Sequence, residues 1–300
     1  MQSEKIKGVA AAITAFLFWG ILPIYWKQLG GVPALELVAH RLIWTSLLLA
    51  ALLVLTGRLG VYRTEFRFSS HLLSHVVRGA LLATNWFVFI WAVLHDQILA
   101  ASLGYFLVPM FNVALGMIFL KERLNPVQLA AVAIAAVGVS FFAINGGDLP
   151  WIPLSIALTF GFYALLRKKA TVGALGGAAI ETVIVLPFAV ALLVLFEING
   201  DGTTLNAPAS INLLLVGTGL ITAIPLVLFG YGAKRITLAS IGLYQYLAPT
   251  AKFALGLWVY HEPFTRIQMG GFILIWTALA IYSWNGLWIH RNRPHPILPE

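Results

Sequence analysis

The sequence predicts an all-α membrane protein of ten transmembrane helices, arranged as two inverted five-helix repeats with both termini in the cytoplasm. Three observations lead to this prediction. Hydrophobic residues make up 60% of the 300 residues and charged residues only 10%, at a mean hydropathy of +0.90, whereas a soluble domain carries about 25% charged residues. The apolar residues fall into segments long enough to cross a bilayer. Part of the second half also repeats part of the first.

Each apolar segment has roughly 20 residues, the length that a helix needs to cross a hydrocarbon core of about 30 Å. The first segment is too long for the apolar part of a signal peptide, which has about 7 to 15 residues, so we expect it to remain as a span. The connections are short and leave no room for a soluble domain. The spans are expected at residues 7–26, 34–56, 72–94, 97–120, 126–145, 152–169, 178–197, 211–232, 237–260 and 267–289.

Basic residues indicate the orientation. If the N-terminus is cytoplasmic, fifteen Lys and Arg residues lie at cytoplasmic ends of spans, and only Lys27 and Arg266 lie at outer ends. This asymmetry follows the positive-inside rule. It accounts for the net charge of +8 without a nucleic-acid partner, so the expected partners are the lipid bilayer and a small molecule.

An internal repeat sets the domain organisation. A shift of 140 residues aligns residues 98–128 with 238–268, and eight of the 31 pairs are identical. Helices four and nine therefore correspond, which divides the chain into residues 1–147 and 148–300. Five helices per unit reverse the orientation, and inverted repeats of this kind place a site at the midplane in many secondary transporters. The most informative matches are Pro109 with Pro249, Gly116 with Gly256, Glu122 with Glu262 and Gln128 with Gln268.

Two prolines, Pro109 and Pro249, fall near the middle of their predicted helices, where each removes a backbone hydrogen bond and kinks the helix. A polar face passes through each kink at helical spacing, and these faces carry Tyr105, Asn112, Gln245 and Lys252. They could line a water-accessible cavity. The alternative is that small and polar residues hold the helices together.

Two cations, Arg41 and Lys252, lie inside predicted spans, each about 12 Å below the outer surface. Their equal depth predicts a joint site for a carboxylate or another anionic group. The alternatives are snorkelling to the outer interface and, for Arg41, pairing with Glu36.

Glu36 and Glu181 occupy similar places in the two repeats, near the start of the second helix of each half. A carboxyl group near a cavity could exchange a proton and couple transport to the proton gradient. The alternative is a carboxylate that faces the favourable end of a helix dipole.

Aromatic and amide residues add to the candidate site. Trp19, Asn85 and Trp86 lie deep in their spans and suit either a small-molecule site or an interhelical hydrogen bond. An aromatic belt explains the tryptophans near span ends, which are Trp26, Trp91, Trp151, Trp258, Trp284 and Trp288.

The sequence shows few residues that could form a catalytic or metal-binding site. The chain has no cysteine, which excludes disulfides and thiolate ligands. His71 and His75 are one helical turn apart but have no third ligand nearby, so no metal site is expected. No nucleophile with a base is readable, and no catalytic residue or cofactor is predicted. An intramembrane enzyme, a channel and a non-transporting membrane regulator remain the alternatives.

Five motifs, taken together and in order, resemble the RarD family, in the EamA branch of the drug/metabolite transporter superfamily. They are "HRLIWTS", "NWFVFIWAV", "SLGYFLVPMFNVALGMIFLKERL", "TAIPLVLFGYGAKRI" and "GLYQYLAPTAKFAL". The resemblance implies a ten-helix inner-membrane permease whose central cavity is lined by helices 1, 3, 4, 6, 8 and 9. The residues that match its motifs are His40, Arg41, Asn85, Trp86, Ser102, Gly104, Tyr105, Pro109, Pro225, Gln245, Tyr246 and Pro249.

The expected function is therefore a secondary transporter that exports small organic metabolites or amphipathic drugs by alternating access. The expected substrate is anionic or zwitterionic. The role expected for Lys252 depends only on its charge within a predicted span, since it is not among the motif residues.

Overall fold

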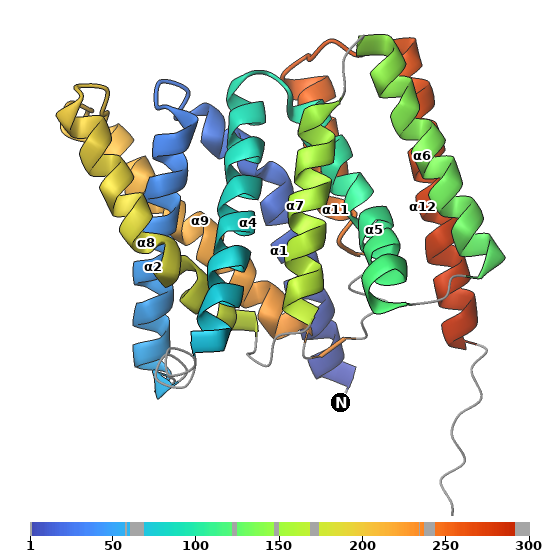
Figure 1. Ribbon diagram of the computed structural model, residues 1–300, viewed down its shortest axis with the longest axis horizontal. Helices are drawn as coiled ribbons and strands as arrows, with labels where there is room; N and C mark the ends of the chain where they lie inside the picture. The colour runs from blue at the N-terminus through green and yellow to red at the C-terminus, as the bar shows by residue number, and fades with distance from the viewer. Residues whose placement is uncertain are drawn as a thin grey trace, which may run out of the picture.

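The structure is a computed structural model that describes residues 2–57, 59–60, 69–121, 125–146, 150–168, 174–233, 235–236 and 244–291. Within these ranges all regular secondary structure is helical, and turns and irregular segments connect the helices (Figure 1). The π-helical turn η1 continues α11 directly. The helices are α1 (Gln2–Lys27), α2 (Ala34–Leu55), α4 (Ser69–Leu94), α5 (Ile98–Leu120), α6 (Pro126–Gly146), α7 (Trp151–Lys168), α8 (Ala174–Ile198), α9 (Ala209–Ala233), α11 (Leu247–Ala254), η1 (Leu255–Val259) and α12 (Arg266–Arg291).

The helices coincide with the expected spans, and most ends agree within a few residues. Seven of them are long and apolar enough to cross a membrane, and three shorter apolar helices accompany them. The prediction of an all-α membrane protein is confirmed. The ninth span differs: α11 begins at Leu247, while the expected start at residue 237 lies outside the described residues.

Helix ends in the two halves carry the same caps at positions 140 residues apart. Asn125 and Gln128 exchange side-chain to backbone hydrogen bonds of 2.9 and 3.1 Å at the start of α6. Thr265 and Gln268 make the same reciprocal pair, at 2.8 and 3.2 Å, at the start of α12. Such capping boxes satisfy the free N–H groups of a helix start. The match of Gln128 with Gln268 thus has a structural reason.

Residues just after α5 and just after η1 also have the same backbone conformation. Lys121 after α5 and His261 after η1 both have left-handed backbones, with φ of 55° and 50°. A left-handed residue ends a helix and turns the chain. Lys121 and His261, 140 positions apart, thus turn the chain with the same backbone conformation.

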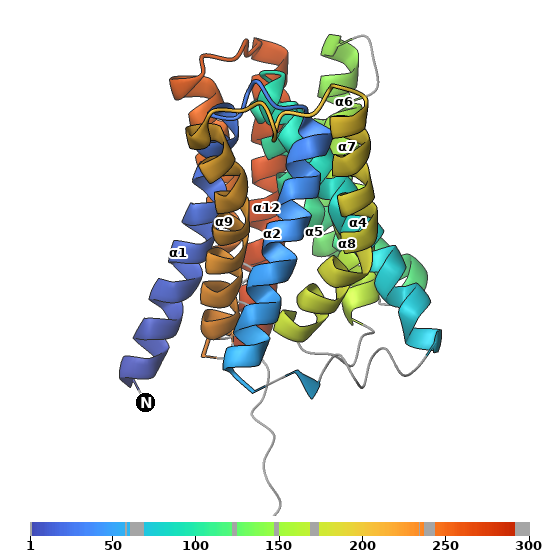
Figure 2. The same ribbon diagram turned by 90° about the vertical axis from the view of Figure 1, so that its left-hand side faces the viewer.

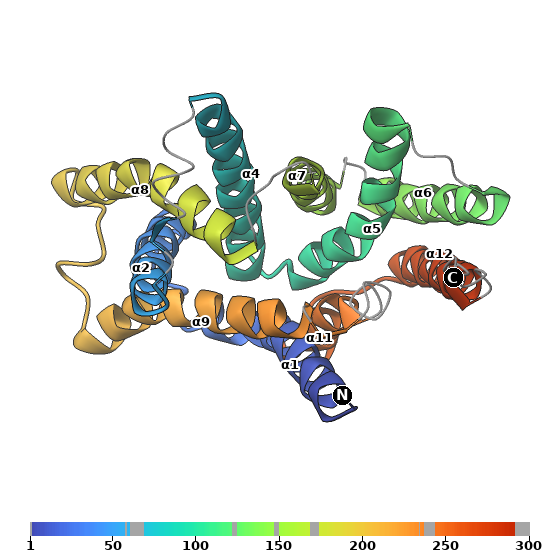
Figure 3. The same cartoon turned by 90° about the horizontal axis from the view of Figure 1, so that it is seen from below.

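Helix packing has the same internal correspondence (Figures 2 and 3). Helices α1 and α9 are in contact, and so are α7 and α4. The second pair is obtained from the first when each helix is exchanged for the one five spans further along or back in the chain. Likewise α1 with α11 corresponds to α7 with α5, and α2 with α9 to α8 with α4. In three further contacting pairs, the two helices are themselves five spans apart, so the exchange leaves the pair unchanged. These pairs are α2 with α8, α5 with α11, and α6 with α12.

The two ends of the bundle are distinct. The N-terminus and the end of α12 lie at one end, and the connections 28–33 and 199–208 lie at the other (Figures 1 and 2). Large apolar side chains such as Phe188, Leu213 and Trp258 are exposed on the outside of the bundle, as expected for surfaces that face lipid rather than water.

Close packing in the interior depends on small residues. A Cβ atom at Gly219 of α9 would lie 2.7 Å from the backbone carbonyl of Trp44 in α2. A Cβ at Gly20 of α1 would lie 2.6 Å from the Cβ of Ala251 in α11. Small residues allow helix backbones to approach in this way within a membrane.

Candidate functional site

Arg41 of α2 lies in the interior of the bundle, with only 4% of its surface exposed. Its Nε atom donates a hydrogen bond of 3.0 Å to the Thr222 hydroxyl of α9. Its guanidinium carbon lies 3.9 Å from the ring centroid of Trp86 and 5.4 Å from that of Trp26. Its Nη1 atom has no hydrogen-bond partner within the described part of the chain. The charge is therefore held by aromatic faces and one hydroxyl, and part of its donor capacity is unused.

Lys252 of α11 is buried to the same extent, at 4% exposed. Its ammonium nitrogen lies 3.6 Å from the ring centroid of Tyr105 and 4.4 Å from that of Phe89. A cation over an aromatic face is attracted to the negative face of the ring, and the attraction grows when water is excluded. The lysine is thus turned inward and does not snorkel to the outer interface.

Hydrogen bonds fix the aromatic wall beside Lys252. The Tyr105 hydroxyl donates to the Asn85 Oδ1 atom at 3.1 Å. The Asn85 Nδ2 atom donates at 3.1 Å to both the Ile156 carbonyl and the Thr159 hydroxyl of α7. Asn85 therefore connects α4, α5 and α7. The interhelical hydrogen bond that its sequence position allowed is present.

Of the eight residues predicted for the cavity, the structure brings five together: Arg41, Asn85, Trp86, Tyr105 and Lys252. The other three lie apart. Trp19 packs between Phe16 and Phe229, with ring centroids 5.6 and 5.8 Å away. Asn112 is exposed, and Gln245 is half-buried in the turn before α11.

The two prolines occupy different places in their helices. Pro109 is inside α5, as predicted. Pro249 is the third residue of α11, and the helix is interrupted at Gln245 and Tyr246. A proline ring clashes with the carbonyl four residues earlier, which here belongs to Gln245. The Pro249 carbonyl accepts a hydrogen bond of 2.7 Å from the buried Ser102 hydroxyl of α5.

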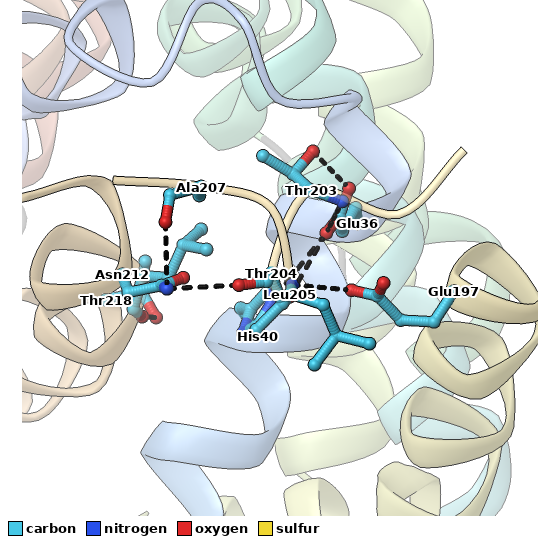
Figure 4. A network of polar contacts seen from close by, with 10 residues as sticks. Glu36, His40, Glu197, Thr203, Thr204, Leu205, Ala207, Asn212 and Thr218 are labelled. Carbon is cyan, nitrogen blue, oxygen red and sulfur yellow. Dashed lines mark hydrogen bonds and ion pairs between the residues drawn. The ribbon is translucent and has the colours of Figure 1, made fainter. Parts of the chain in front are cut away.

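Glu36 anchors the connection between α8 and α9 to α2 (Figure 4). It accepts hydrogen bonds from the Thr203 backbone at 3.0 Å and the Thr203 hydroxyl at 2.9 Å. The Thr204 hydroxyl lies 3.3 Å from the same carboxylate and 2.9 Å from the His40 Nε2 atom. Glu36 is fully buried in this network. It does not pair with Arg41, which was one of the alternatives for that residue.

Glu181 forms a second network near the opposite end of the bundle. Arg78 Nε donates to its carboxylate at 2.7 Å and Arg167 Nη1 at 3.1 Å. The Tyr163 hydroxyl adds a bond of 3.0 Å, and Glu181 is fully buried. Glu36 therefore fastens α2 to the connection 199–208 at one end of the bundle. Glu181 fastens α8 to α4 and α7 near the other end.

Three residues at the two cations were not predicted. Phe89 and Thr222 carry no signal in the sequence beyond helical spacing. Trp26 was assigned to an aromatic belt, and this assignment is wrong, because its side chain is fully buried beside Arg41. Trp26 lies near the end of a predicted span, a position typical of belt residues, but this end of α1 packs in the bundle interior.

Two cavities lie elsewhere. One of about 550 Å³ is lined by Val127, Trp284 and Trp288 between α6 and α12. One of about 350 Å³ opens beside Gly31, Thr203 and Asn206 at the connections between helices. Among the described residues, no group of three or more His, Cys, Asp or Glu side chains has the arrangement of a metal site.

A bundle of apolar helices with buried charges in its interior defines the class as a multi-pass membrane protein with a polar centre. Residues 6–144 match the EamA-like transporter family. Relatives match over nearly the whole chain, so the chain belongs to the EamA-like transporter family and is related to the RarD proteins.

Three relatives illustrate the match. The uncharacterized transporter YojE of Bacillus subtilis is 38% identical over 98% of this chain and 99% of its own length. Protein RarD of Escherichia coli is 39% identical over 95% of this chain and 97% of its own. The chloramphenicol-sensitive protein RarD of Pseudomonas aeruginosa is 29% identical over 96% and 97%.

A solved crystal structure has the same fold. It superposes with a TM-score of 0.61 over 94% of this chain and 98% of its own, at 19% identity. With the family names, the fold identifies the chain as a membrane transporter.

Proposed function

We propose that the chain is a secondary transporter that exports small organic metabolites or amphipathic drugs across the inner membrane by alternating access. Its moving units are residues 1–147 and 148–300. The observation that carries the proposal is the pairing of helix contacts, in which every principal pair has a counterpart five spans away. Matched caps at Asn125 and Thr265 support the same division.

In this mechanism the halves exchange their arrangements, so that the interior opens to one side and then to the other. The Glu36 network would hold the outer end and the Glu181 network the cytoplasmic end. Arg41 and Lys252 lie between them, and an anionic or zwitterionic solute would be bound there. Pro109 and Pro249 mark the places where helices four and nine bend.

Coupling to a proton gradient is part of the proposal. Protonation of Glu36 or Glu181 would remove the negative charge that holds each network together. Opening of an end would then be linked to proton uptake. In the variants Glu36→Gln and Glu181→Gln, we expect transport that no longer responds to an imposed pH gradient.

Purified protein in proteoliposomes tests the function directly. A transporter moves solute at a saturable rate and leaves it chemically unchanged, a channel shows no saturation at comparable concentrations, and an enzyme alters the solute. Chloramphenicol is a suitable test solute because of the name of the P. aeruginosa relative. Absence of flux for every anionic and drug-like solute tried, with protein that is folded and correctly inserted, would refute the proposal.

A further inference from the structure

The two buried cations rest on one face of α4. Arg41 lies over Trp86 and Lys252 lies over Phe89. Residues three apart on a helix are neighbours, with about 5 to 6 Å between their Cβ atoms. The guanidinium and the ammonium are therefore close together in the interior of the bundle, so a single small group could contact both.

Among the described residues, no carboxylate forms an ion pair with either cation. Glu36 and Glu181 are engaged in the networks at the two ends. Glu262 accepts backbone hydrogen bonds at the start of α5. Asp96 pairs with Lys27 at the surface. The arrangement thus places two positive charges together without the negative partner that buried charges normally have.

Unused hydrogen-bond donors lie at the same place. Arg41 Nη1 and Trp26 Nε1 are both buried, and neither has a hydrogen-bond partner among the residues that the structure describes. The Arg41 guanidinium carbon lies 5.4 Å from the centroid of the Trp26 ring. Buried N–H groups are nearly always satisfied. A bound acceptor would satisfy both the donors and the charges.

We propose that this site binds an organic anion that carries no ammonium group near its anionic group, which excludes α-amino acids and amines as substrates. The inference deepens the proposed function and rests on it for the claim that the bound anion is transported. A zwitterion would place its ammonium beside two cations, with no carboxylate among the described residues to receive it. The rings of Trp26, Trp86, Phe89 and Tyr105 favour an apolar or aromatic body beside the anionic group.

Three probes with one shared body test the charge rule: 3-phenylpropanoate, phenylalanine and 2-phenylethylamine. Thermal unfolding of the purified full-length protein in a non-ionic detergent measures binding, because a ligand that binds the folded state raises the melting temperature. We expect a concentration-dependent increase with 3-phenylpropanoate and none with the other two. Quenching of tryptophan fluorescence by the anion gives a second measurement.

Variants locate the site. Lys252→Met keeps much of the side-chain length and removes the charge, and should weaken binding of 3-phenylpropanoate about tenfold or more, the usual effect of losing a hydrogen bond to a charged group. Lys252→Arg should retain more affinity. Lys7→Met removes an exposed lysine near the N-terminus and should bind like the parent. Arg41→Gln provides a second test at the same site.

Several results would overturn the inference. These are equal stabilisation by phenylalanine or the amine, no stabilisation by the anion, and an effect of the anion that Lys252→Met and Arg41→Gln leave unchanged. Flux measurements in proteoliposomes distinguish failure of the anion site from failure of the proposed transport function. Binding at the site without flux would refute transport and leave the anion site intact, whereas saturable flux of the amine would refute the anion site and leave transport intact.

Discussion

The Arg78 guanidinium donates a hydrogen bond of 2.7 Å to the Glu181 carboxylate, although the two residues are 103 positions apart in the chain and both are buried. The bond joins α4 to α8. A carboxylate contributed by one proposed half thus holds a helix of the other.

Breaking this pair should be costly. Glu181→Gln removes the carboxylate that accepts from both Arg78 and Arg167, and losing one member of a buried ion pair typically costs about 3 to 5 kcal/mol. Denaturation of the purified protein in mixed micelles would measure this change. Glu4→Gln is the control, because it removes surface ion pairs with Lys7 and Arg235 and should have little effect. Equal stability of the two variants would contradict the structural role of Glu181.

Glu262 should give stability a distinct pH dependence. Burial raises the pKa of its carboxyl group above the ordinary value of 4.5, although hydrogen bonds from the Leu99 and Ile98 amides act in the opposite direction. The protonated form is therefore favoured by folding. The resulting stability is fully present below about pH 4.5 and is lost as the pH rises through the pKa of the folded state.

The matching measurement compares melting temperatures of the parent and Glu262→Gln across this pH range. The advantage of the parent should be greatest at low pH and should shrink toward neutrality. An advantage that grows with pH would show that the two amide hydrogen bonds outweigh burial.

Two glycines of α9 form a matched pair for testing helix contact. Gly219→Ala places a methyl group 2.7 Å from the Trp44 backbone, and Gly230→Ala places one in open space. The first variant should lose about 1 to 3 kcal/mol through overpacking. The second should be neutral or slightly stabilised, because alanine favours the helix. Similar melting temperatures would mean that α2 and α9 are not in close contact.

The prolines should affect transport more than assembly. Pro109→Ala and Pro249→Ala are expected to insert and purify normally but to transport more slowly. A proline in a helix removes a backbone hydrogen bond, here in helices that the mechanism requires to rearrange. Transport rates in proteoliposomes, normalised to the amount of inserted protein, measure this. Unchanged rates in both variants would make the prolines packing features only.

Reporter fusions test orientation. Fusions after Gly57 and after His290 should report a cytoplasmic location, and one after Gly200 should report an external one. A reversed signal at either cytoplasmic position would refute both the proposed orientation and the inverted arrangement.

Much of the fold could be predicted because it depends on local properties of the sequence. Span length and apolar content located the helices, and the match of Gln128 with Gln268 anticipated equivalent positions that prove to be capping residues. The depth of Arg41 and Lys252 in the spans allowed either burial or snorkelling, and the structure shows that both are buried.

Side-chain partners could not be predicted in the same way. Which face of a helix meets which neighbour depends on rotation and on contacts between distant segments. The Glu262 carboxylate reaches the Ile98 amide across 164 positions, and no spacing rule indicates this. Trp26 was misassigned for the same reason, because a tryptophan near a span end has the same sequence signature whether it faces lipid or the interior.

The π turn of η1 makes the two proposed halves unequal. The Tyr260 amide donates to the Leu255 carbonyl, five residues earlier, at 2.9 Å, while the aligned residues 115–119 of α5 are regular α-helix. Two identical halves would give inward-facing and outward-facing states of equal free energy. With one half altered, the states differ, and a difference of about 1.4 kcal/mol already makes one of them tenfold more populated. Under the proposed mechanism, the empty protein therefore has a preferred resting orientation, to which the different hydrogen bonding of this single helical turn contributes.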